Sequence, residues 1–412
     1  MAAISQTSLR KTSEAESAYA WVRLFTALAI GTVGSVGMWS VVVALPAVQA
    51  EFAIARADAS LPFTLAMLGF GVGGVAMGRL ADRFGIIVPV LCGAATICAG
   101  YVAASLAPNL WVFALASFLA GVGSSATFAP LIADLSHWFT RRRGIAVAIA
   151  ASGNYTAGAV WPPVVQHFIE TSGWRATHFG IGLFCLATMT PLAFVLLRRV
   201  ATHKEAAEGT AAAGALARLG ISPNALMALI CAAAVGCCVA MSMPQVHIVA
   251  YCGDLGYGVA RGAEMLSLML GFGIVSRLAS GWICDRIGGL RTLLLGSVLQ
   301  GIALVLFLPF DGLVSLYVIS ALFGLFQGGI VPMYAIIVRQ YFPPREAGTR
   351  VGIAIFASIV GMAWGGWVSG WIFDLTGSYR AAFLNGIAWN LVNISVMTWL
   401  LLRTRQPRLA VA

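Results

Sequence analysis

Two matching stretches decide the fold of this 412-residue chain: GRLADRFG at residues 78–85 and GWICDRIG at residues 281–288. Each follows a long apolar run, and glycine, aspartate, arginine and glycine occupy the same places in both. The second stretch lies 203 residues after the first. A repeat at this distance indicates that the chain contains two related halves.

Two further pairs of motifs repeat at nearly the same interval. WF at 138–139 matches YF at 341–342, and GWR at 173–175 matches GSYR at 377–380, with shifts of 203 to 205 residues. A shift that stays constant over so much of the chain is difficult to obtain by chance. We therefore expect that one six-helix unit was duplicated.

The composition predicts that both halves lie in a membrane. Hydrophobic residues make up 60% of the chain and charged residues 10%, whereas soluble domains carry about 25% charged residues. The apolar residues form runs of about 20, the length of helix that crosses a hydrocarbon core. Helix is the spanning structure that such runs allow, because lipid satisfies no backbone hydrogen bond. We predict twelve transmembrane helices, at residues 22–47, 61–79, 86–107, 111–132, 144–169, 178–197, 224–251, 263–283, 292–310, 315–337, 350–373 and 382–402.

One long polar segment divides the predicted helices six and six. We expect an N-terminal tail at 1–21, an N-terminal bundle at 22–197, a flexible linker at 198–223, a C-terminal bundle at 224–402 and a C-terminal tail at 403–412. The linker combines charged and small residues, which favours flexibility. The first segment is polar and continues into a long apolar run, which is typical of a retained tail and not of a cleaved leader.

The basic residues predict the orientation. With a cytoplasmic N-terminus, 20 of the 25 Lys and Arg residues fall on the cytoplasmic side, and Arg56, Arg175, Arg261 and Arg380 fall on the opposite side. Cytoplasmic loops of membrane proteins carry such an excess. We therefore expect a multi-pass protein of the cell membrane (the cytoplasmic or inner membrane) with both termini in the cytoplasm. The basic pI then needs no nucleic-acid partner.

The sequence shows no pattern for a metal or cofactor. Its eight cysteines lie in or beside the apolar runs, without a CxxC pair or a His/Cys cluster of zinc spacing. We expect them to be packing residues. No nucleotide-binding motif is present, and no nucleophile–base pair can be assembled from the few polar residues in the spans. We expect neither an enzyme nor an ATP-driven pump.

A G-x-x-x-D-R-x-G loop after the second and eighth helices resembles the hallmark loop of the major facilitator superfamily, and the six-plus-six arrangement covers the whole chain. The resemblance implies an all-α membrane fold, with a central cavity between two six-helix repeats and transport by alternating access. The expected conformational loop residues are Gly78, Asp82, Arg83, Gly85, Gly281, Asp285, Arg286 and Gly288.

Each residue type in these loops has a local physical role. We expect the two aspartates to pair with nearby arginines and helix-end amides. Gly78 and Gly281 are expected to permit close approach of neighbouring helices. Ile86 and Ile87 stand where the family usually has a basic residue, so the first loop is expected to form a weaker ion-paired latch.

A narrower resemblance starts from WFTRRRGIAVAIAASG at residues 138–153. This stretch is similar to the one that opens the fifth helix of monocarboxylate transporters and of the related oxalate/formate antiporters. ESAYAW at 16–21 is a degenerate version of the motif that precedes the first helix of that family. The resemblance implies a carrier of small organic anions such as monocarboxylates.

Arg277 indicates the same substrate class. It lies eight residues before Asp285, about 12 Å along a helix and so near the midplane. Its counterpart in the first half is Gly74. An arginine at this depth is costly unless it faces a cavity or an anion, and its guanidinium matches a carboxylate with two parallel bonds.

In monocarboxylate transporters an arginine in the eighth helix binds the carboxylate, and the resemblance gives Arg277 this role. The alternative is a structural arginine that bonds helix carbonyls or reaches toward the cytoplasm.

Two departures from the family leave the coupling ion open. An aspartate often stands one turn before this arginine, where the chain has Gly273, and a lysine often stands in the first helix, where the chain has Trp39. Both groups are tied to proton coupling in the family. Besides Cys and Tyr, His247 is the one titratable side chain that we place inside a span, so it is a candidate for proton binding or for a hydrogen bond between helices.

The other candidates are polar or aromatic side chains at mid-depth. Each could contact a substrate or bond to a neighbouring helix. The predicted substrate-binding set is Arg277, Asn154, Tyr155, Trp39, Gln327, His247, Gln245 and Trp364.

We therefore predict a monomeric secondary carrier of small organic anions, driven by proton symport or anion exchange. Two alternatives remain. An exporter of drugs or other amphipathic solutes would tolerate the loss of Arg277. A transporter-like receptor would bind a solute without moving it, although the chain has no large soluble appendage to carry a signal.

Overall fold

The computed structural model describes residues 16–135, 138–139, 143–197 and 220–405. Within these ranges every regular element is a helix, and eleven stretches are long and apolar enough to cross a membrane. One of them, Ile145–Val195, has 51 residues, far more than the roughly 20 that cross a bilayer.

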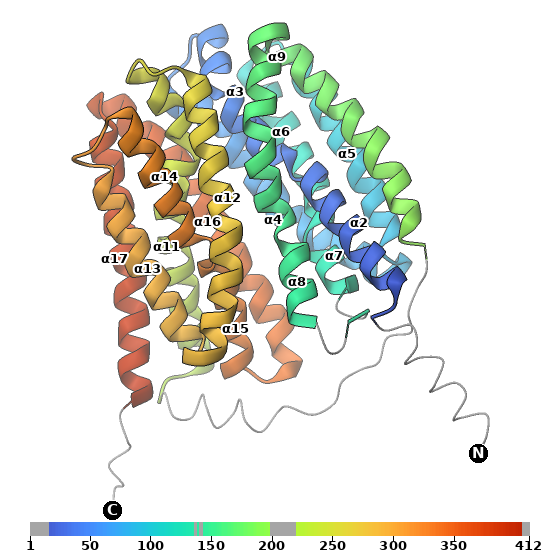
Figure 1. The fold of residues 1–412 in the computed structure, drawn as a ribbon, viewed down its shortest axis with the longest axis vertical. Helices are drawn as coiled ribbons and strands as arrows, with labels where there is room; N and C mark the ends of the chain where they lie inside the picture. Colours follow the sequence, from blue (N-terminus) through green and yellow to red (C-terminus); the bar gives the residue numbers. More distant parts are fainter. Residues whose placement is uncertain (1–15, 136–137, 140–142, 198–219, 406–412) are drawn as a thin grey trace, which may run out of the picture. The chain divides into compact units, whose positions relative to one another are not determined.

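The long stretch consists of two spans. Its main helix, α9 (Gly153–Val195), is broken at Gly173, where φ is 80° and ψ is 159°. Figure 1 shows α9 doubling back on itself. Counting its two arms separately gives twelve spans, which confirms the predicted all-α membrane fold.

The described residues cluster into two compact units. The first draws on Met1–Phe52 and Leu65–Lys204, and the second draws on Ala53–Thr64 and Glu205–Ala412. The helix α4 (Arg56–Phe84) therefore contributes its first turns to the second unit and the rest to the first. The other helices of the first unit are α2 (Ala18–Gly34), α3 (Val36–Phe52), α5 (Ile87–Ser105), α6 (Leu110–Ser124), the 3-10 helix η1 (Ser125–Thr127), α7 (Ala129–Leu135), α8 (Arg143–Ala151) and α9.

The second unit has seven further helices within the described residues. They are α11 (Pro223–Asp254), α12 (Val259–Ile287), α13 (Gly289–Leu306), α14 (Leu313–Gln327), α15 (Ile330–Tyr341), α16 (Pro344–Thr376) and α17 (Tyr379–Arg405). α2 begins before the predicted span, and α17 runs into the predicted tail. Residues 1–15, 198–219 and 406–412, which make up most of the predicted tails and linker, lie outside the described residues.

The fourth span is broken at the same place in both repeats. In the first unit α6 ends at Ser124 and α7 begins at Ala129, and in the second unit α14 ends at Gln327 and α15 begins at Ile330. Ser124 and Gln327 are 203 residues apart, so the break belongs to the repeated unit. The predicted spans at 111–132 and 315–337 agree with Leu110–Leu135 and Leu313–Tyr341, but the break inside each was not predicted.

Glycines bring helix backbones into contact at equivalent places. A methyl group added at Gly121 in α6 would overlap the carbonyl oxygen of Ala66 in α4. One added at Gly324 in α14 would overlap the carbonyl oxygen of Met269 in α12. Close contact of this kind is typical of packing between transmembrane helices, where small residues replace the hydrophobic effect as the source of association.

The glycines of the two loop motifs do not have the predicted packing role. No heavy atom of a described residue lies within 4 Å of a methyl group added at Gly78 or Gly281. Gly73 is the residue of α4 that packs against Val122 of α6, and Gly78 lies five residues later, about 140° around the helix. The prediction was therefore wrong about which glycines make the contact.

The last glycine of each motif ends its helix. Gly85 follows α4 with φ 81°, and Gly288 follows α12 with φ 84°, a backbone conformation that favours glycine. Asp82 and Asp285 are exposed, and neither forms an ion pair or a side-chain hydrogen bond with a described residue.

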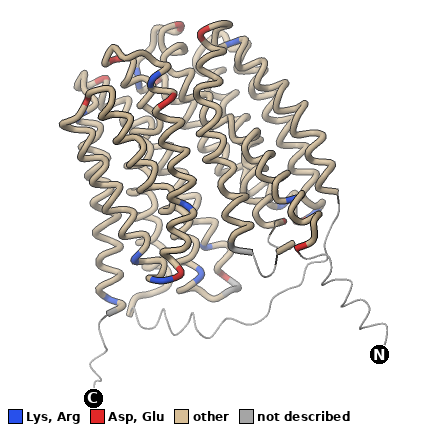
Figure 2. Tube along the Cα trace, viewed as in Figure 1, with Lys and Arg blue, Asp and Glu red and all other residues tan. Residues whose placement is uncertain are grey.

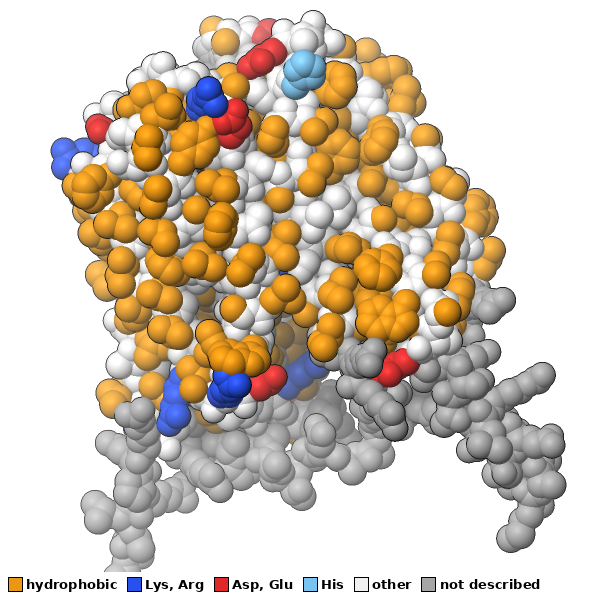
Figure 3. Space-filling view, viewed as in Figure 1, with side chains coloured by type: hydrophobic (Ala, Val, Ile, Leu, Met, Phe, Trp, Pro, Cys, Tyr) orange, Lys and Arg blue, Asp and Glu red, His pale blue; other side chains and the backbone are white. Residues whose placement is uncertain are grey.

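The surface is that of a membrane protein. On α6, Trp111 and Leu115 are 67% and 64% exposed, while Phe113 and Ser117 are buried. The apolar face of this helix therefore points away from the unit's interior. Figure 2 shows that most charged residues lie toward the ends of the helices, and Figure 3 shows hydrophobic side chains over the middle of the visible face.

The two family-like motifs of the first unit pack together. Tyr19 lies edge-on to Trp138 with ring centroids 5.2 Å apart. Next to them Arg23, 1% exposed, forms an ion pair of 2.7 Å with Asp134 and donates a bond to the carbonyl oxygen of Leu196. Arg23 thus lies inside the bundle, and the carboxylate partner offsets the cost of its burial.

The glycine contact between α12 and α14 predicts an effect on stability. Gly324→Ala should lower the free energy of unfolding by about 1–3 kcal/mol, because the added methyl group meets a carbonyl oxygen on a helix that cannot retreat freely. Thermal unfolding of the purified protein in detergent would measure it. Gly281→Ala is the matched control on the partner helix and should be neutral or stabilising. Equal losses from the two substitutions would contradict the assignment of this contact.

Candidate functional site

Arg277 lies on α12, beside the break between α14 and α15 in the fourth span of the second unit. Its Nε donates to the carbonyl oxygen of Gly328 at 3.3 Å, and its side chain is partly buried. Ten residues separate it from the end of α12 at Ile287, about 15 Å along the helix. The predicted mid-depth position is therefore also the position of a helix break.

Residues of α12 satisfy the backbone groups that the break exposes. The Oγ of Ser276 accepts the N–H of Gly329 at 3.2 Å, and Arg277 bonds the carbonyl oxygen of the preceding residue. A broken helix persists inside a membrane only where other groups satisfy its backbone. Ser276 and Arg277 therefore stabilise the break, and the break fixes the guanidinium group.

Gly273, which stands where the family often has an aspartate, lies at a packing contact between helices. A methyl group added at Gly328 would overlap the carbonyl oxygen of Gly273, so the backbones of α12 and α14 touch there. Gly273 is itself buried.

Two predicted glutamines meet beside the break. The Nε2 of Gln245 in α11 donates to the Oε1 of Gln327 at 3.0 Å. Both side chains are buried, and the Nε2 of Gln327 has no hydrogen-bond partner among the described residues. Gln327 precedes Gly328 and so lies next to the residue that binds Arg277. This part of the second unit holds an arginine and an unpartnered amide donor.

The predicted residues of the first unit form a separate group. The indole nitrogen of Trp39 in α3 donates to the side-chain oxygen of Asn154 at 3.3 Å and to its carbonyl oxygen at 3.2 Å. Trp39 and Tyr155 are buried. A tryptophan at the family's lysine position thus ties the first span to the fifth.

The other two candidates lie apart from Arg277 in the contacts described. His247 is fully buried, and its Nε2 lies 2.8 Å from the carbonyl oxygen of Gly366. Its role here is to join α11 to α16. Trp364 is 47% exposed and contacts Trp367, with ring centroids 5.3 Å apart and an angle of 44° between the rings.

Sequence reasoning missed a second histidine inside a span. His178 lies in α9 and is 1% exposed, so His247 is not the one titratable side chain of this kind. The predicted span 178–197 begins with His178, so the error lies in overlooking this residue and not in the bounds of the span.

A charged cluster within the second unit holds the start of α4. Arg56 forms an ion pair of 3.1 Å with Asp254 and donates to the hydroxyl of Tyr379 at 2.6 Å. The backbone N–H groups of Arg56 and Ala57 donate to the two oxygens of Asp374, at 2.9 and 2.7 Å. Asp374 therefore caps the first turn of α4.

The candidate site of the second unit consists of one cation and neutral polar side chains. Among the described residues, no group of three or more His, Cys, Asp or Glu side chains could hold a metal ion. The charged group at mid-depth is a guanidinium held at a helix break, a place where transporters bind their substrates.

Comparison with known proteins establishes the class. The family model described as Major Facilitator Superfamily matches residues 27–315 and 265–412. The chain belongs to this superfamily of membrane transporters.

Individual relatives narrow the resemblance. The chain is 26% identical over 405 residues to monocarboxylate transporter 13 of Rattus norvegicus, covering 94% of this chain and 90% of the relative. It is 27% identical to the MFS-type transporter opdF of Penicillium oxalicum, over 69% of this chain and 66% of that one. A bacterial homolog of the human lysosomal transporter Spinster, in an inward-facing and occupied conformation, has the same fold, with a TM-score of 0.73 at 13% identity over 94% of this chain and 97% of that one.

The bond across the break leads to a local prediction. Ser276→Ala should lower the free energy of unfolding by about 1 kcal/mol, because it leaves the buried N–H of Gly329 without its acceptor. Hydrogen exchange should also become faster at Gly329.

Ser320→Ala is the matched control. Ser320 is a buried serine of the same unit whose Oγ has no partner among the described residues, so its removal should be neutral or stabilising. Thermal unfolding and exchange mass spectrometry would measure both variants. If hydrogen exchange at Gly329 were unchanged in Ser276→Ala, this would contradict the role of the Ser276 hydroxyl as acceptor for the Gly329 N–H.

Proposed function

We propose that this transporter carries small organic anions of the monocarboxylate type by alternating access, and that Arg277 binds the carboxylate group. The observation that carries the proposal is the guanidinium held at mid-depth against the α14–α15 break. A cation there is expensive unless it serves an anion or a cavity. The similarity to a monocarboxylate transporter over nearly the whole chain supports the same substrate class.

The internal repeat also supports a dedicated role for this arginine. The equivalent position of the first unit is Gly74, and no described heavy atom lies within 4 Å of a methyl group added there. The repeated scaffold therefore leaves this position without a packing neighbour. In the second unit the equivalent residue is the cation Arg277. A cation at this position is better suited to binding an anionic ligand than to packing between helices.

Gln327 is the proposed second contact. Its Nε2 has a hydrogen to donate, and the residue lies beside the carbonyl group that holds Arg277. A guanidinium and an amide donor together can bind both oxygens of one carboxylate. Trp39, Asn154 and Tyr155 are proposed to line the path on the first unit. Proton symport or anion exchange would drive the transport.

We further propose that the protein works as a monomer in the cell membrane with both termini in the cytoplasm. The excess of basic residues on one side of the predicted spans supports this orientation. The two D-R loops would then lie at the cytoplasmic ends of α4 and α12, where they would influence opening and closing.

Uptake into liposomes tests the substrate class. Purified protein would be reconstituted and offered labelled formate, acetate, lactate, pyruvate and oxalate. Arg277→Gln should lower kcat/KM for the transported acid at least tenfold, since a hydrogen-bonded charge contributes about 1.5–3 kcal/mol. Arg277→Lys should recover only part of this loss, because lysine cannot form the two parallel bonds.

Arg261→Gln is the matched control. Arg261 is an exposed arginine at the start of the same helix, paired with Glu264, and its replacement should leave uptake unchanged. Full transport by Arg277→Gln, or no uptake of any acid by the parent protein, would contradict the carboxylate assignment. Apolar cations would then be the next solutes to test.

A further inference from the structure

His178 has one nitrogen bonded and one without a partner. Its Nδ1 lies 2.8 Å from the carbonyl oxygen of Trp174, one turn earlier in α9. A carbonyl oxygen only accepts hydrogen bonds, so Nδ1 carries the hydrogen and Nε2 presents a lone pair. Nε2 is buried and has no hydrogen-bond partner among the described residues.

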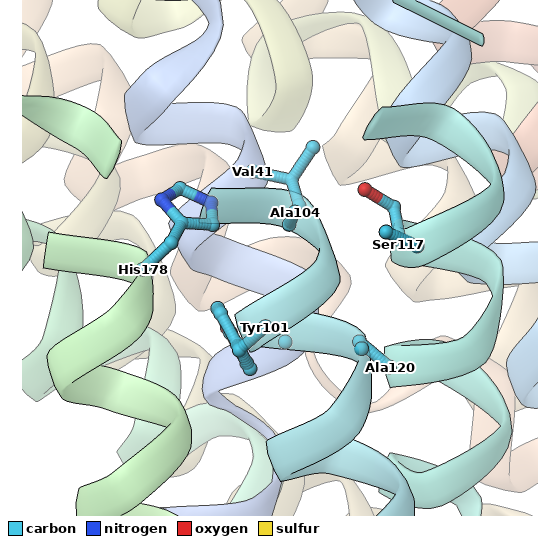
Figure 4. Close-up of a pocket in the computed structure, with 9 residues that line it drawn as sticks. Val41, Tyr101, Ala104, Ser117, Ala120 and His178 are labelled. Carbon is cyan, nitrogen blue, oxygen red and sulfur yellow. The ribbon is translucent and has the colours of Figure 1, made fainter. Parts of the chain in front are cut away.

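The lone pair is next to a small cavity inside the first unit. Nine residues from α3, α5, α6 and α9 line it, and the space open to the centre of a water molecule is about 10 Å³, close to what one water needs. Figure 4 shows the imidazole extending from α9 and Ser117 of α6 on the other side. Tyr101 is the third lining residue with a polar side chain.

The polar groups around the cavity can hold a water molecule. The hydroxyl of Ser117 donates to the carbonyl oxygen of Phe113 at 2.8 Å, so its lone pairs can still accept a bond. The hydroxyl of Tyr101 is 2.5 Å from that of Ser40 in α3. A water molecule could thus donate to Nε2 of His178 and to Ser117, within the two to four partners that buried waters have.

Three aromatic rings surround the imidazole. The ring centroids of Tyr101, Phe113 and Trp174 lie 5.4, 5.6 and 5.7 Å from that of His178. These contacts are tilted or edge-on, and they hold the imidazole in one orientation beside the cavity.

The charged and titratable groups around the imidazole come from α3, α5 and α9. From α3, Glu51 accepts the indole N–H of Trp174, and it also pairs with Arg175 at 2.7 Å. From α9 itself come Arg175 and, two turns on, the thiol of Cys185. α5 contributes the hydroxyl of Tyr101, and α6 contributes no titratable side chain to the cavity lining. The Glu51 carboxylate is thus shared between Trp174 and Arg175.

The second unit lacks this site at the equivalent place. With the shift of 205 residues found between Arg175 and Arg380, the counterpart of His178 is Phe383. Phe383 stacks on Phe307 with centroids 4.8 Å apart and an angle of 10° between the rings. The packing of the repeat therefore does not require a polar side chain at this position, because an apolar ring fills it in the second unit. The histidine and its cavity are a feature of the first unit.

We propose that this cavity is a proton-binding site, in which one water molecule lies beside Nε2 of His178 and the imidazole binds the proton that moves with the anion. A hydronium ion from the aqueous phase gives its proton to Nε2, which leaves an imidazolium and a water molecule. Both ring nitrogens are then donors, one to Trp174 and one to the water. The coupling role rests on the proposed anion transport, whereas proton binding itself does not.

The pH dependence of uptake tests the coupling. Liposomes with the parent protein should take up the transported acid at different rates at about pH 6 and about pH 8, the range in which histidine changes its charge. In His178→Gln and His178→Phe the ratio of the two rates should approach one. The phenylalanine variant reproduces the residue of the second unit, so it keeps an aromatic ring in place. His167→Gln replaces an exposed histidine of the same helix and should keep the ratio of the parent protein.

A second measurement tests proton binding without transport. NMR of protein labelled at histidine, with the His178→Phe spectrum to assign the signal, should show the His178 imidazole titrating between the same two pH values. If both variants kept the parent protein's ratio of uptake rates at the two pH values, the proposed coupling would be overturned. The proposal that the protein carries anions would still stand. An imidazole signal that stays neutral would overturn the site. If the parent protein transports no acid, the proposed function fails, and the titration alone decides whether the proton site exists.

Discussion

The architecture depends on the contact between the backbones of α12 and α14. Gly324 and Gly328 lie against the carbonyl groups of Met269 and Gly273, and no side chain larger than hydrogen fits there. In a bilayer the hydrophobic effect does not hold helices together, so such close packing has to supply the association. The same contact brings Ser276 and Arg277 within bonding distance of the broken backbone at Gly328 and Gly329. Helix packing and the candidate site are thus one feature of the second unit.

The two repeats share this scaffold and differ in the groups placed on it. Both have a fourth span that breaks, and both have a glycine contact at the same position. At two equivalent places, however, one repeat carries a polar group and the other does not: Arg277 stands opposite Gly74, and His178 stands opposite Phe383. The shared packing requires neither polar group, and this asymmetry supports the two proposals, an anion bound in the second unit and a proton bound in the first.

The number of spans and the duplication could be predicted from the sequence, because apolar runs of bilayer length and a constant repeat distance are properties of the chain itself. The breaks could not. Ser125–Thr127 contains no proline or glycine, and the Gly328-Gly329 pair lies in a run that otherwise reads as continuous helix. The sequence also failed to show that Gly73, and not Gly78, makes the helix contact. Gly78 belongs to a visible motif, whereas the face of α4 that meets α6 cannot be read from the sequence. Arg277 could be found because a lone charge in an apolar run is conspicuous. His178 begins the predicted sixth span, but its burial and its unpartnered Nε2 depend on packing between helices, which the sequence does not show.

The central claim is that Arg277 binds the carboxylate of a transported anion. A structure of the purified transporter with its transported acid bound, determined at a resolution that shows side chains, tests this most directly. The account predicts both carboxylate oxygens within hydrogen-bond distance of the Arg277 guanidinium or the Gln327 amide, in the second unit beside the α14–α15 break. An anion bound at other residues, with Arg277 bonded only to Gly328, would contradict it.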